Sequence, residues 1–319
     1  MFKLSIQTTG IFGPYSWDDT YRLIAEAGFE SADANLDQLF PFTKVKVREP
    51  IPKFFLKETS DLETLEHFKP IREAAEKYGI THFQGHAPVP SVLFDTHAGD
   101  EEYNAAIFEM IRKSIIGADY INCRNLVVHP FFYYYGAKTN PQDIWDMNIE
   151  KYLRLSKTSK EYGVKICLEN MFAPNRGRSY ADICDNPYEA AKYVDTLNSI
   201  AGEGTFGFCL DTGHALVGGV DVKDFMILMG DRITCLHVHD NPGHDIHMAP
   251  FEGMLDWKRF VEGLAEIRFD KTMDFETHGI WDRFGPEVGP YMLKVVEQTG
   301  RYFDREVEKL VKQADEDAR

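Results

Sequence analysis

Short apolar runs alternate with longer amphipathic segments along the whole chain. The runs are rich in β-branched and aromatic residues, as is typical of strands that are buried on both faces. Eight such strands are predicted, at Phe2–Thr8, Phe29–Asn35, Ile80–Ala87, Asn125–Pro130, Lys165–Asn170, Phe206–Asp211, Ile233–Asp240 and Thr272–Thr277. Between and after them, apolar positions recur at spacings of three and four, which predicts helices over Trp17–Ala27, Leu62–Tyr78, Glu101–Asp119, Asp143–Tyr162, Pro187–Leu197, Val222–Met229, Asp256–Ile267 and Glu287–Lys312.

Residues at the helix boundaries agree with this pattern. Ser16 and Asp256 stand where an N-cap is expected, because their side-chain oxygens can accept hydrogen bonds from the first free backbone N–H groups. Gly28, Gly79 and Gly163 each follow a predicted helix, where glycine supplies the left-handed cap.

The alternation of eight strands with eight helices predicts an all-parallel sheet with right-handed crossovers. A closed (β/α)₈ TIM barrel of the α/β class, forming one domain over residues 1–319, suits this length. An open, doubly wound sheet is the alternative, but no Gly-x-Gly-x-x-Gly motif follows the first strand. Residues 37–60 are predicted to be an insertion that forms a lid or rim, and residues 314–319 a frayed tail.

Composition narrows the partners. The chain carries 35 basic and 51 acidic residues, a formal net charge of −16, which disfavours a nucleic-acid surface built on Lys and Arg. Its five cysteines are spread singly with no Cys-x-x-Cys pair, which fits a reducing cytosol, so a cytoplasmic location is expected. No apolar run approaches the roughly 20 residues of a membrane span, so no membrane partner is expected.

Six successive predicted strands, the third to the eighth, end in side chains that can bind a metal. Because the carboxyl ends of the strands meet at one mouth of a barrel, these side chains are expected to lie together. Bare carboxylates at the ends of apolar strands would be costly, and a divalent cation would give them a shared counter-charge. Carboxylates with imidazole suit Mn²⁺, Mg²⁺, Co²⁺ or Zn²⁺. The six residues are His86, His129, Glu169, Asp211, His237 and Glu276.

Other histidines and one aspartate are weaker candidates. His86 and His129 could also be substrate-binding groups, and His214 could bind a metal or only cap a helix. The long polar loop after the seventh strand could bring Asp245 and His247 into the site. His239 is interpreted as structural, on the face opposite to His237.

The motifs resemble those of the xylose isomerase-like TIM barrel superfamily, in its branch of sugar-phosphate isomerases and epimerases. They are Leu168-Glu169-Asn170, Leu210-Asp211-Thr212-Gly213-His214, Leu236-His237-Val238-His239-Asp240-Asn241, Asp245-Ile246-His247, Phe251-Glu252-Gly253-Met254-Leu255-Asp256-Trp257 and Phe275-Glu276. Similarity to the single-metal site of ketose 3-epimerases implies that Glu169, Asp211, His237 and Glu276 are the metal ligands. It also implies that Glu169 and Glu276 are the acid/base pair. Phe251 departs from the pattern, because a Pro-Gly-x-Gly-like turn is common there.

The implied function is isomerisation or epimerisation of a sugar or sugar phosphate by proton transfer through a metal-bound enediolate. One metal ion is expected, with up to three left open, and the partner is a small sugar; a homo-oligomer is also left open. Aromatic residues expected to wall the sugar are Phe12, Tyr15, Phe131, Tyr133 and Trp281. Anchors considered for a phosphate are Arg124, Lys138, Arg176 and Arg178.

Two alternatives use the same residues. The chain is also similar to endonuclease IV-type enzymes, phosphodiesterases that act on abasic DNA with three zinc ions. Their ligand order reads here as His86, His129, Glu169, Asp211, His214, His237, Asp245, His247 and Glu276. The second alternative is a dehydratase acting on a sugar or cyclitol at the same metal site.

Overall fold

Eight parallel strands form the centre of the molecule. The computed structural model describes residues 2–89, 91–133, 140–172 and 183–318. The strands are β1 (Leu4–Gln7), β2 (Ser31–Asn35), β3 (Gln84–His86), β5 (Asn125–Val127), β7 (Lys165–Glu169), β8 (Phe206–Asp211), β9 (Ile233–His237) and β10 (Met273–Phe275). They pair in the order β10-β1-β2-β3-β5-β7-β8-β9.

The sheet curves round until its two outer strands meet. Just beyond β9, the Val238 amide donates to the Asp274 carbonyl at 2.8 Å, and the Glu276 amide donates to the Val238 carbonyl at 3.2 Å. These bonds bring β9 beside β10 and make the barrel nearly closed. The predicted single-domain α/β barrel is therefore confirmed, and the open sheet is wrong.

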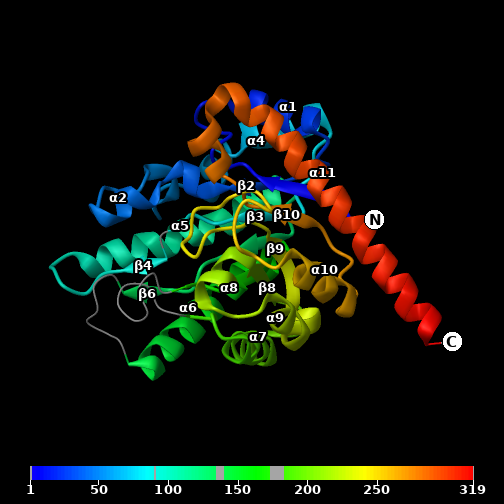
Figure 1. Ribbon diagram of the computed structural model, residues 1–319. Coiled ribbons are helices and arrows are strands. Elements are labelled where there is room, and N and C mark those ends of the chain that lie inside the picture. Colours follow the sequence, from blue (N-terminus) through cyan, green and yellow to red (C-terminus); the bar gives the residue numbers. More distant parts are fainter. Residues whose placement is uncertain (1, 90, 134–139, 173–182, 319) are drawn as a thin grey trace.

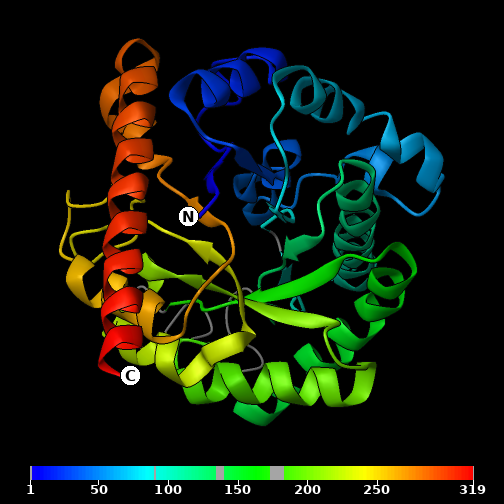
Figure 2. The same ribbon diagram turned by 90° about the vertical axis from the view of Figure 1, so that its right-hand side faces the viewer.

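Helices cover the outside of the strands (Figures 1 and 2). The Ser16 N-cap is confirmed, since its hydroxyl accepts from the Asp19 amide, and so are the left-handed caps at Gly28, Gly79 and Gly163. The main helices are α1 (Trp17–Ala27), α4 (Lys69–Tyr78), α5 (Asp100–Tyr120), α6 (Pro141–Tyr162), α7 (Pro187–Ala201), α8 (Thr212–Gly218), α9 (Val222–Met229), α10 (Trp257–Glu266) and α11 (Gly279–Asp317). Within the described ranges, every helix is too short or too polar to span a bilayer.

Several boundaries differ from the prediction. The expected helix Leu62–Tyr78 is two helices, α3 (Asp61–Leu65) and α4. The last helix is longer than expected: it starts at Gly279, is interrupted at Gly285 and continues to Asp317, so most of the segment expected to fray is helical. A small parallel pair that was not predicted joins β4 (Val92–Leu93) to β6 (Phe132–Tyr133).

The insertion at 37–60 is anchored to the core. It contains a 3₁₀ turn η1 (Leu36–Leu39), helix α2 (Phe42–Lys46) and a second turn η2 (Lys53–Phe55). Four of its apolar side chains are fully or almost fully buried: Phe40, Val45, Ile51 and Phe55. Burying such side chains stabilises the packed arrangement of this segment against the core.

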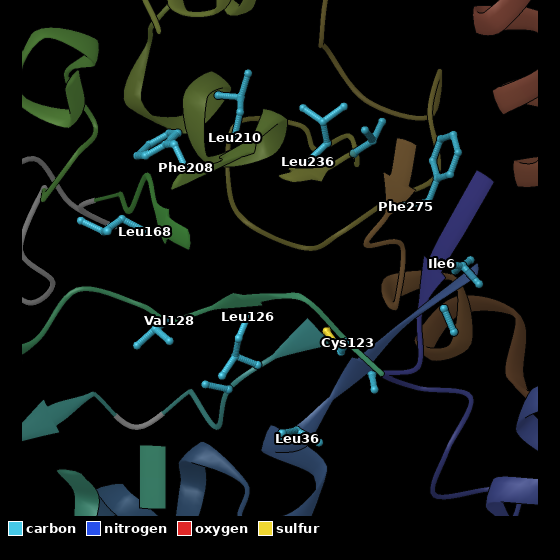
Figure 3. Packing of buried hydrophobic residues seen from close by; sticks show 14 of the residues in the cluster. Ile6, Leu36, Cys123, Leu126, Val128, Leu168, Phe208, Leu210, Leu236 and Phe275 are labelled. Carbon is cyan, nitrogen blue, oxygen red and sulfur yellow. The ribbon is translucent and has the colours of Figure 1, made fainter. Parts of the chain in front are cut away.

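Buried apolar side chains form two layers, separated by the strand backbone. Large side chains such as Leu126, Leu168, Phe208 and Leu236 belong to the main core cluster (Figure 3). Their neighbours in the chain point the other way, because successive strand residues face opposite sides. A separate small cluster, Val127, Cys167, Cys209 and Cys235, therefore fills the inside of the barrel. All five cysteines are free and buried, as small apolar residues would be.

Candidate metal centre

The polar residues at the strand ends stand one layer above the cysteines inside the barrel. Glu169, Asp211 and His237 each lie two positions after Cys167, Cys209 and Cys235, so they face the same interior. The cysteine layer closes the barrel beneath them. The strand ends thus bring carboxylates and imidazoles together at the carboxyl-terminal mouth, where barrel enzymes carry their active sites.

Four of these residues form the central group. Glu169, Asp211, His237 and Glu276 each offer one ligand atom, and these atoms all lie within 4.8 Å of one another. His237 Nδ1 is 3.0 Å from Glu169 Oε1 and 3.1 Å from Glu276 Oε2. All four side chains are buried. The arrangement that the sequence predicts for a single divalent ion is therefore present in space.

A second group forms on the other oxygen of Glu169. His129 Nε2 lies 3.0 Å and His86 Nε2 lies 3.5 Å from Glu169 Oε2, and the two imidazole nitrogens are 3.1 Å apart. Glu169 thus belongs to the central group through Oε1 and contacts the two histidines through Oε2. A carboxylate with one oxygen toward each group can bridge two cations.

A third group lies on the loop side of Asp211. Asp245 and His247 belong to the loop after β9, and the structure brings both to His214 and His239, with ligand atoms within 4.8 Å of one another. His247 Nε2 is 3.1 Å and His214 Nε2 is 3.6 Å from Asp245 oxygens. His239 Nε2 lies 2.9 and 3.0 Å from the two oxygens of Asp211.

The placement of His239 corrects the interpretation made from the sequence. His237 and His239 are two residues apart, and such residues share a face of an extended segment instead of opposing each other. His239 therefore reaches the same cluster and contacts Asp211. His214 does more than cap a helix: the cap of α8 is the Asp211 side chain, which accepts from the His214 amide, and the His214 ring turns into the cluster.

In each of four histidines, one ring nitrogen is bonded to a backbone carbonyl or to Asp33, and the other nitrogen contacts a carboxylate or an imidazole of the cluster. The Nδ1 atoms of His86, His214 and His247 lie 2.6, 2.8 and 3.1 Å from the backbone carbonyls of Ala87, Asn170 and Glu276. His237 is reversed, with Nε2 3.2 Å from Asp33 Oδ2 and Nδ1 toward the glutamates. Metal-binding histidines in proteins are oriented in this way.

Two oxygen atoms test whether these groups suit a metal. Glu169 Oε2 and Asp245 Oδ1 are buried and accept no hydrogen bond from any described residue. Imidazole nitrogens nevertheless lie 3.0 and 3.1 Å from them. Buried carboxylate oxygens normally accept hydrogen bonds. Here the oxygen and nitrogen atoms lie close together without forming hydrogen bonds, and a cation between them could bind the lone pairs of both. The donor set, oxygen and imidazole nitrogen without thiolate, fits a divalent metal.

Neighbouring histidines keep the Glu169 carboxyl group ionised. Burial raises the pKa of the Glu169 carboxyl, but His237 and His129 outweigh burial and hold that pKa well below its usual range. Burial lowers the pKa of His214, but Asp211 and Asp245 raise it well above its ordinary value. For His247, Asp245 and Glu276 likewise outweigh burial and raise the pKa to about 9. Protons on His214 and His247 thus offset part of the carboxylate charge, and a bound cation would displace them.

A cavity of about 370 Å³ opens above the centre. The imidazoles and carboxylates form its floor, and Phe132, Met171 and Phe172 give it an apolar side. Thr9, Asn35 and Asp37 add polar groups. Among the described residues that line it, none is Lys or Arg. The volume and mixed lining are those of a small-molecule site.

The aromatic residues expected at this cavity lie elsewhere. Phe12 stacks on Trp17, and Tyr15 donates its hydroxyl to the Pro286 carbonyl. Phe131 is fully buried, and neither Tyr133 nor Trp281 lines the cavity. Sequence position next to a strand end did not fix which side chain turns inward, and Phe132 and Phe172 do so instead.

Of the four expected phosphate anchors, the structure describes only Arg124. Arg124 stands just before β5, at the end of the barrel opposite to Glu169, and is bonded to Asp119 and the Tyr162 carbonyl. Lys138, Arg176 and Arg178 lie outside the described residues.

Two residues of the centre were missed by the sequence analysis. Asp33 accepts from His237, and Gln84 in turn donates to Asp33. His278, at the end of the eighth predicted strand, stacks on His247 with ring centroids 3.9 Å apart. Asp33 and Gln84 each stand two residues before the polar end of their strand, Asn35 and His86. The inward face of β2 and β3 therefore carried the signal.

The fold and the site together define a parallel α/β barrel with a histidine–carboxylate centre at its carboxyl-terminal mouth. The family model described as xylose isomerase-like TIM barrel matches residues 21–291, and the chain belongs to this family. The resemblance stated from the motifs is thereby confirmed.

Individual relatives are similar to the chain over most of its length. It is 27% identical over 219 residues to the uncharacterised protein MJ1311 of Methanocaldococcus jannaschii, covering 68% of this chain and 71% of that protein. The structure of L-ribulose 3-epimerase is similar with a TM-score of 0.68, 14% identity and coverage of 99% and 97%. The IOLI protein with a binding zinc atom is similar with a TM-score of 0.61, 19% identity and 98% coverage of both chains. At these identities the structures share the fold.

Proposed function

We propose that this protein is a divalent-metal-dependent sugar isomerase or epimerase. The observation that carries the proposal is the central group, in which Glu169, Asp211, His237 and Glu276 converge at the mouth of the barrel. The family contains metal-dependent enzymes of this class, and a solved structure with the same fold is a ketose 3-epimerase.

The proposed chemistry is proton transfer at a carbon next to a carbonyl. A divalent ion held by the central group would supply Lewis-acid polarisation of the carbonyl and a neighbouring hydroxyl. Glu169 ends β7 and Glu276 follows β10, so the two carboxylates reach the cavity from different sides of the barrel wall. One removes the proton and leaves an enediolate, and the other returns a proton to the opposite face or to the neighbouring carbon.

The cavity lining supports a neutral, hydroxyl-rich substrate. Asn35, Asp37 and Thr9 offer groups that can bind sugar hydroxyls, while Phe132 and Phe172 can cover the apolar face of a sugar. A phosphorylated substrate would gain from Lys or Arg beside the phosphate, and the described lining has neither. The described part of the lining therefore offers no basic anchor for a phosphate.

A second candidate rests on a separate observation. The pair of His86 and His129 on Glu169, and the group of His214, Asp245 and His247, are not needed by an enzyme with one metal ion. They fit the three-metal arrangement of an endonuclease IV-type phosphodiesterase on abasic DNA. The net charge of −16 and the acidic cavity oppose a nucleic-acid substrate.

Metal content and activity separate the candidates. Elemental analysis is expected to find about one divalent ion per chain for the sugar enzyme and about three for the phosphodiesterase. A panel of ketoses and aldoses with Mn²⁺, Co²⁺, Mg²⁺ or Zn²⁺ in D₂O should give an isomeric sugar that contains solvent deuterium. Net loss of water instead would identify the dehydratase, and cleavage of abasic DNA without sugar turnover would establish the nuclease.

A variant tests the acid/base assignment. Glu276→Gln should fold and yet lose turnover by about 10²-fold or more, because the amide cannot exchange the proton. Asp195→Asn is the matched control, since Asp195 is a surface carboxylate paired with Arg232. Full turnover in Glu276→Gln would contradict the assignment.

A further inference from the structure

Helix α11 carries a stripe of exposed apolar side chains. Val288, Val295 and Tyr302 are spaced by seven residues, and Tyr291 lies between them, so all four share one face of the helix. Tyr291 is 70% exposed and Val295 52% exposed. The helix runs along the outside of the molecule (Figure 2). Single exposed apolar residues are common, but a continuous stripe marks a contact surface.

Phe251 extends this stripe at a cost in backbone strain. Its φ of 72° lies in the left-handed region, which is uncommon for a bulky residue and costs on the order of 1–3 kcal/mol. The side chain is 58% exposed, and its ring centroid is 6.3 Å from that of Tyr302. The turn that departs from the family pattern thus places an aromatic ring beside the stripe instead of hiding it.

Three charged residues lie along one flank of the stripe: Glu287 and Arg305, of opposite sign, near its two ends, and Lys294 beside Val295. Glu287 and Arg305 are eighteen residues apart, which is five turns of an α-helix, so both stand on the same flank. Both are exposed, and neither has an ion-pair partner among the described residues. Arg305 is unusual in this, since the other arginines that the structure describes each contact a carboxylate, Arg259 and Arg301 among them.

We propose that two copies of the chain associate through α11, packed antiparallel across a two-fold axis near Val295. The axis would bring Val295 against Val295 of the second copy and Val288 against Tyr302. In an antiparallel helix pair, the same flanks of the two helices meet, so Glu287 of each copy would face Arg305 of the other, twice.

The pattern specifies a second copy of this chain better than any other occupant. A two-fold interface needs one surface patch that is complementary to itself: if residue i of one copy contacts residue j of the other, then residue j of the first copy contacts residue i of the second. A stripe centred on Val295 with unpaired charges of opposite sign at its ends meets that requirement. An anionic lipid surface is disfavoured, because the chain carries a net charge of −16.

Charge exchange tests the pairing. Sedimentation velocity over a wide concentration range is expected to show a dimer with twice the 36.6 kDa mass of the chain. Glu287→Arg and Arg305→Glu should each raise the dissociation constant roughly tenfold or more through like charges. The double exchange E287R/R305E should restore wild-type association. A wild-type chain that stays monomeric, or a double variant no better than the single ones, overturns the proposal.

A cross-link tests the axis independently. All five cysteines of the chain are buried, so the thiol that Val295→Cys introduces is the one accessible to oxidation. Mild oxidation should convert this variant to a covalent dimer, because the two introduced thiols face each other across the axis. Ile200→Cys is the control, as Ile200 is 59% exposed but lies on α7. Equal cross-linking of both variants, or no cross-link at Val295→Cys, contradicts the proposed geometry.

Discussion

His237 donates from Nε2 to Asp33 Oδ2 at 3.2 Å, on the side of its ring that faces away from Glu169 and Glu276. The same oxygen accepts from Gln84 Nε2 at 2.9 Å, and Gln84 also donates to the Leu236 carbonyl. Asp33 therefore fixes both the orientation of the imidazole and the nitrogen that carries its proton. Nδ1 is left to face the carboxylates, as a metal ligand must.

Removal of Asp33 is expected to weaken metal binding without unfolding the barrel. Asp33→Ala should lower metal affinity by about 10–100-fold, the range seen when outer-shell partners of ligands are lost. Asp33→Asn should lower it less, because an amide oxygen can still accept from the ring. Calorimetric titration with Mn²⁺ or Zn²⁺ measures both, with Asp195→Asn as the surface control. Unchanged affinity in Asp33→Ala would show that the ring is held by other contacts.

Metal removal should lower the stability of the whole chain. An ion that binds only the folded state stabilises it by about 2.7 kcal/mol at a free concentration 100-fold above Kd. Thermal unfolding after chelation should therefore occur at a lower temperature, and readdition of the ion should reverse the loss. The increase in unfolding temperature when the ion is added back should be smaller in Glu276→Gln, because this variant lacks one anionic ligand. An unfolding temperature that is insensitive to chelator and ion would contradict a metal centre.

Much of the fold followed from periodicity alone. The short apolar runs located the eight barrel strands, because strands that are buried on both faces consist of nearly continuous apolar residues. Helix ends marked by Ser16, Gly28 and Gly163 were placed well because capping is a local interaction. The break before α4 was missed because tertiary packing decides it. Helix α8 was missed because its N-cap, Asp211, belongs to a motif that was assigned to the end of a strand.

The site was predictable where strand order determines it and not where loops do. Residues on the inward face at strand ends, such as Glu169 and Asp211, meet because parallel strands bring their carboxyl ends together. The wall of the cavity depends on how loops turn, so Phe172 lines it and Tyr15 does not. Asp33 and His237 are 204 residues apart, so the inward-facing position of Asp33 on β2 could suggest that it belongs to the centre but not that His237 is its partner.

A buried histidine away from the centre should make stability depend on pH. His82 lies between the Tyr21 hydroxyl and the Ile121 carbonyl, and burial lowers its pKa from 6.5 to about 4. The unfolded chain therefore binds this proton first. The stability that His82 contributes is fully present above pH 6.5 and is lost as pH falls toward 4.

Urea unfolding at two pH values measures this contribution. Between pH 7 and pH 5 the wild type should lose about 2 kcal/mol on account of His82, as follows from the two pKa values by linkage. His82→Gln should be less stable than the wild type at pH 7, but its free energy of unfolding should not show the decrease between pH 7 and pH 5 that is due to His82. His67→Gln, at an exposed histidine, is the control and should retain the wild-type pH dependence. A wild-type slope in His82→Gln would refute the assignment.

Two glycines of helix α8 allow a matched test of the third group. A methyl group on Gly213 would overlap the His239 ring, whereas one on Gly218 would meet open space. Gly213→Ala should therefore displace His239 from its contacts of 2.9 and 3.0 Å with Asp211, at a cost of about 1–3 kcal/mol of stability through overpacking. Gly218→Ala should be neutral or stabilising by up to about 1 kcal/mol, since alanine favours the helix.

Urea unfolding and metal analysis of these two variants separate packing from function. Because Asp211 stands between the central group and the third group, the shift of His239 in Gly213→Ala should also reduce the metal retained on dialysis. Gly218→Ala should retain the wild-type amount. If both variants keep wild-type stability and metal, the ring of His239 can move without consequence, and its contact with Asp211 is not part of the centre. If Gly213→Ala loses stability but keeps its metal, His239 packs against Asp211 without supporting the ion.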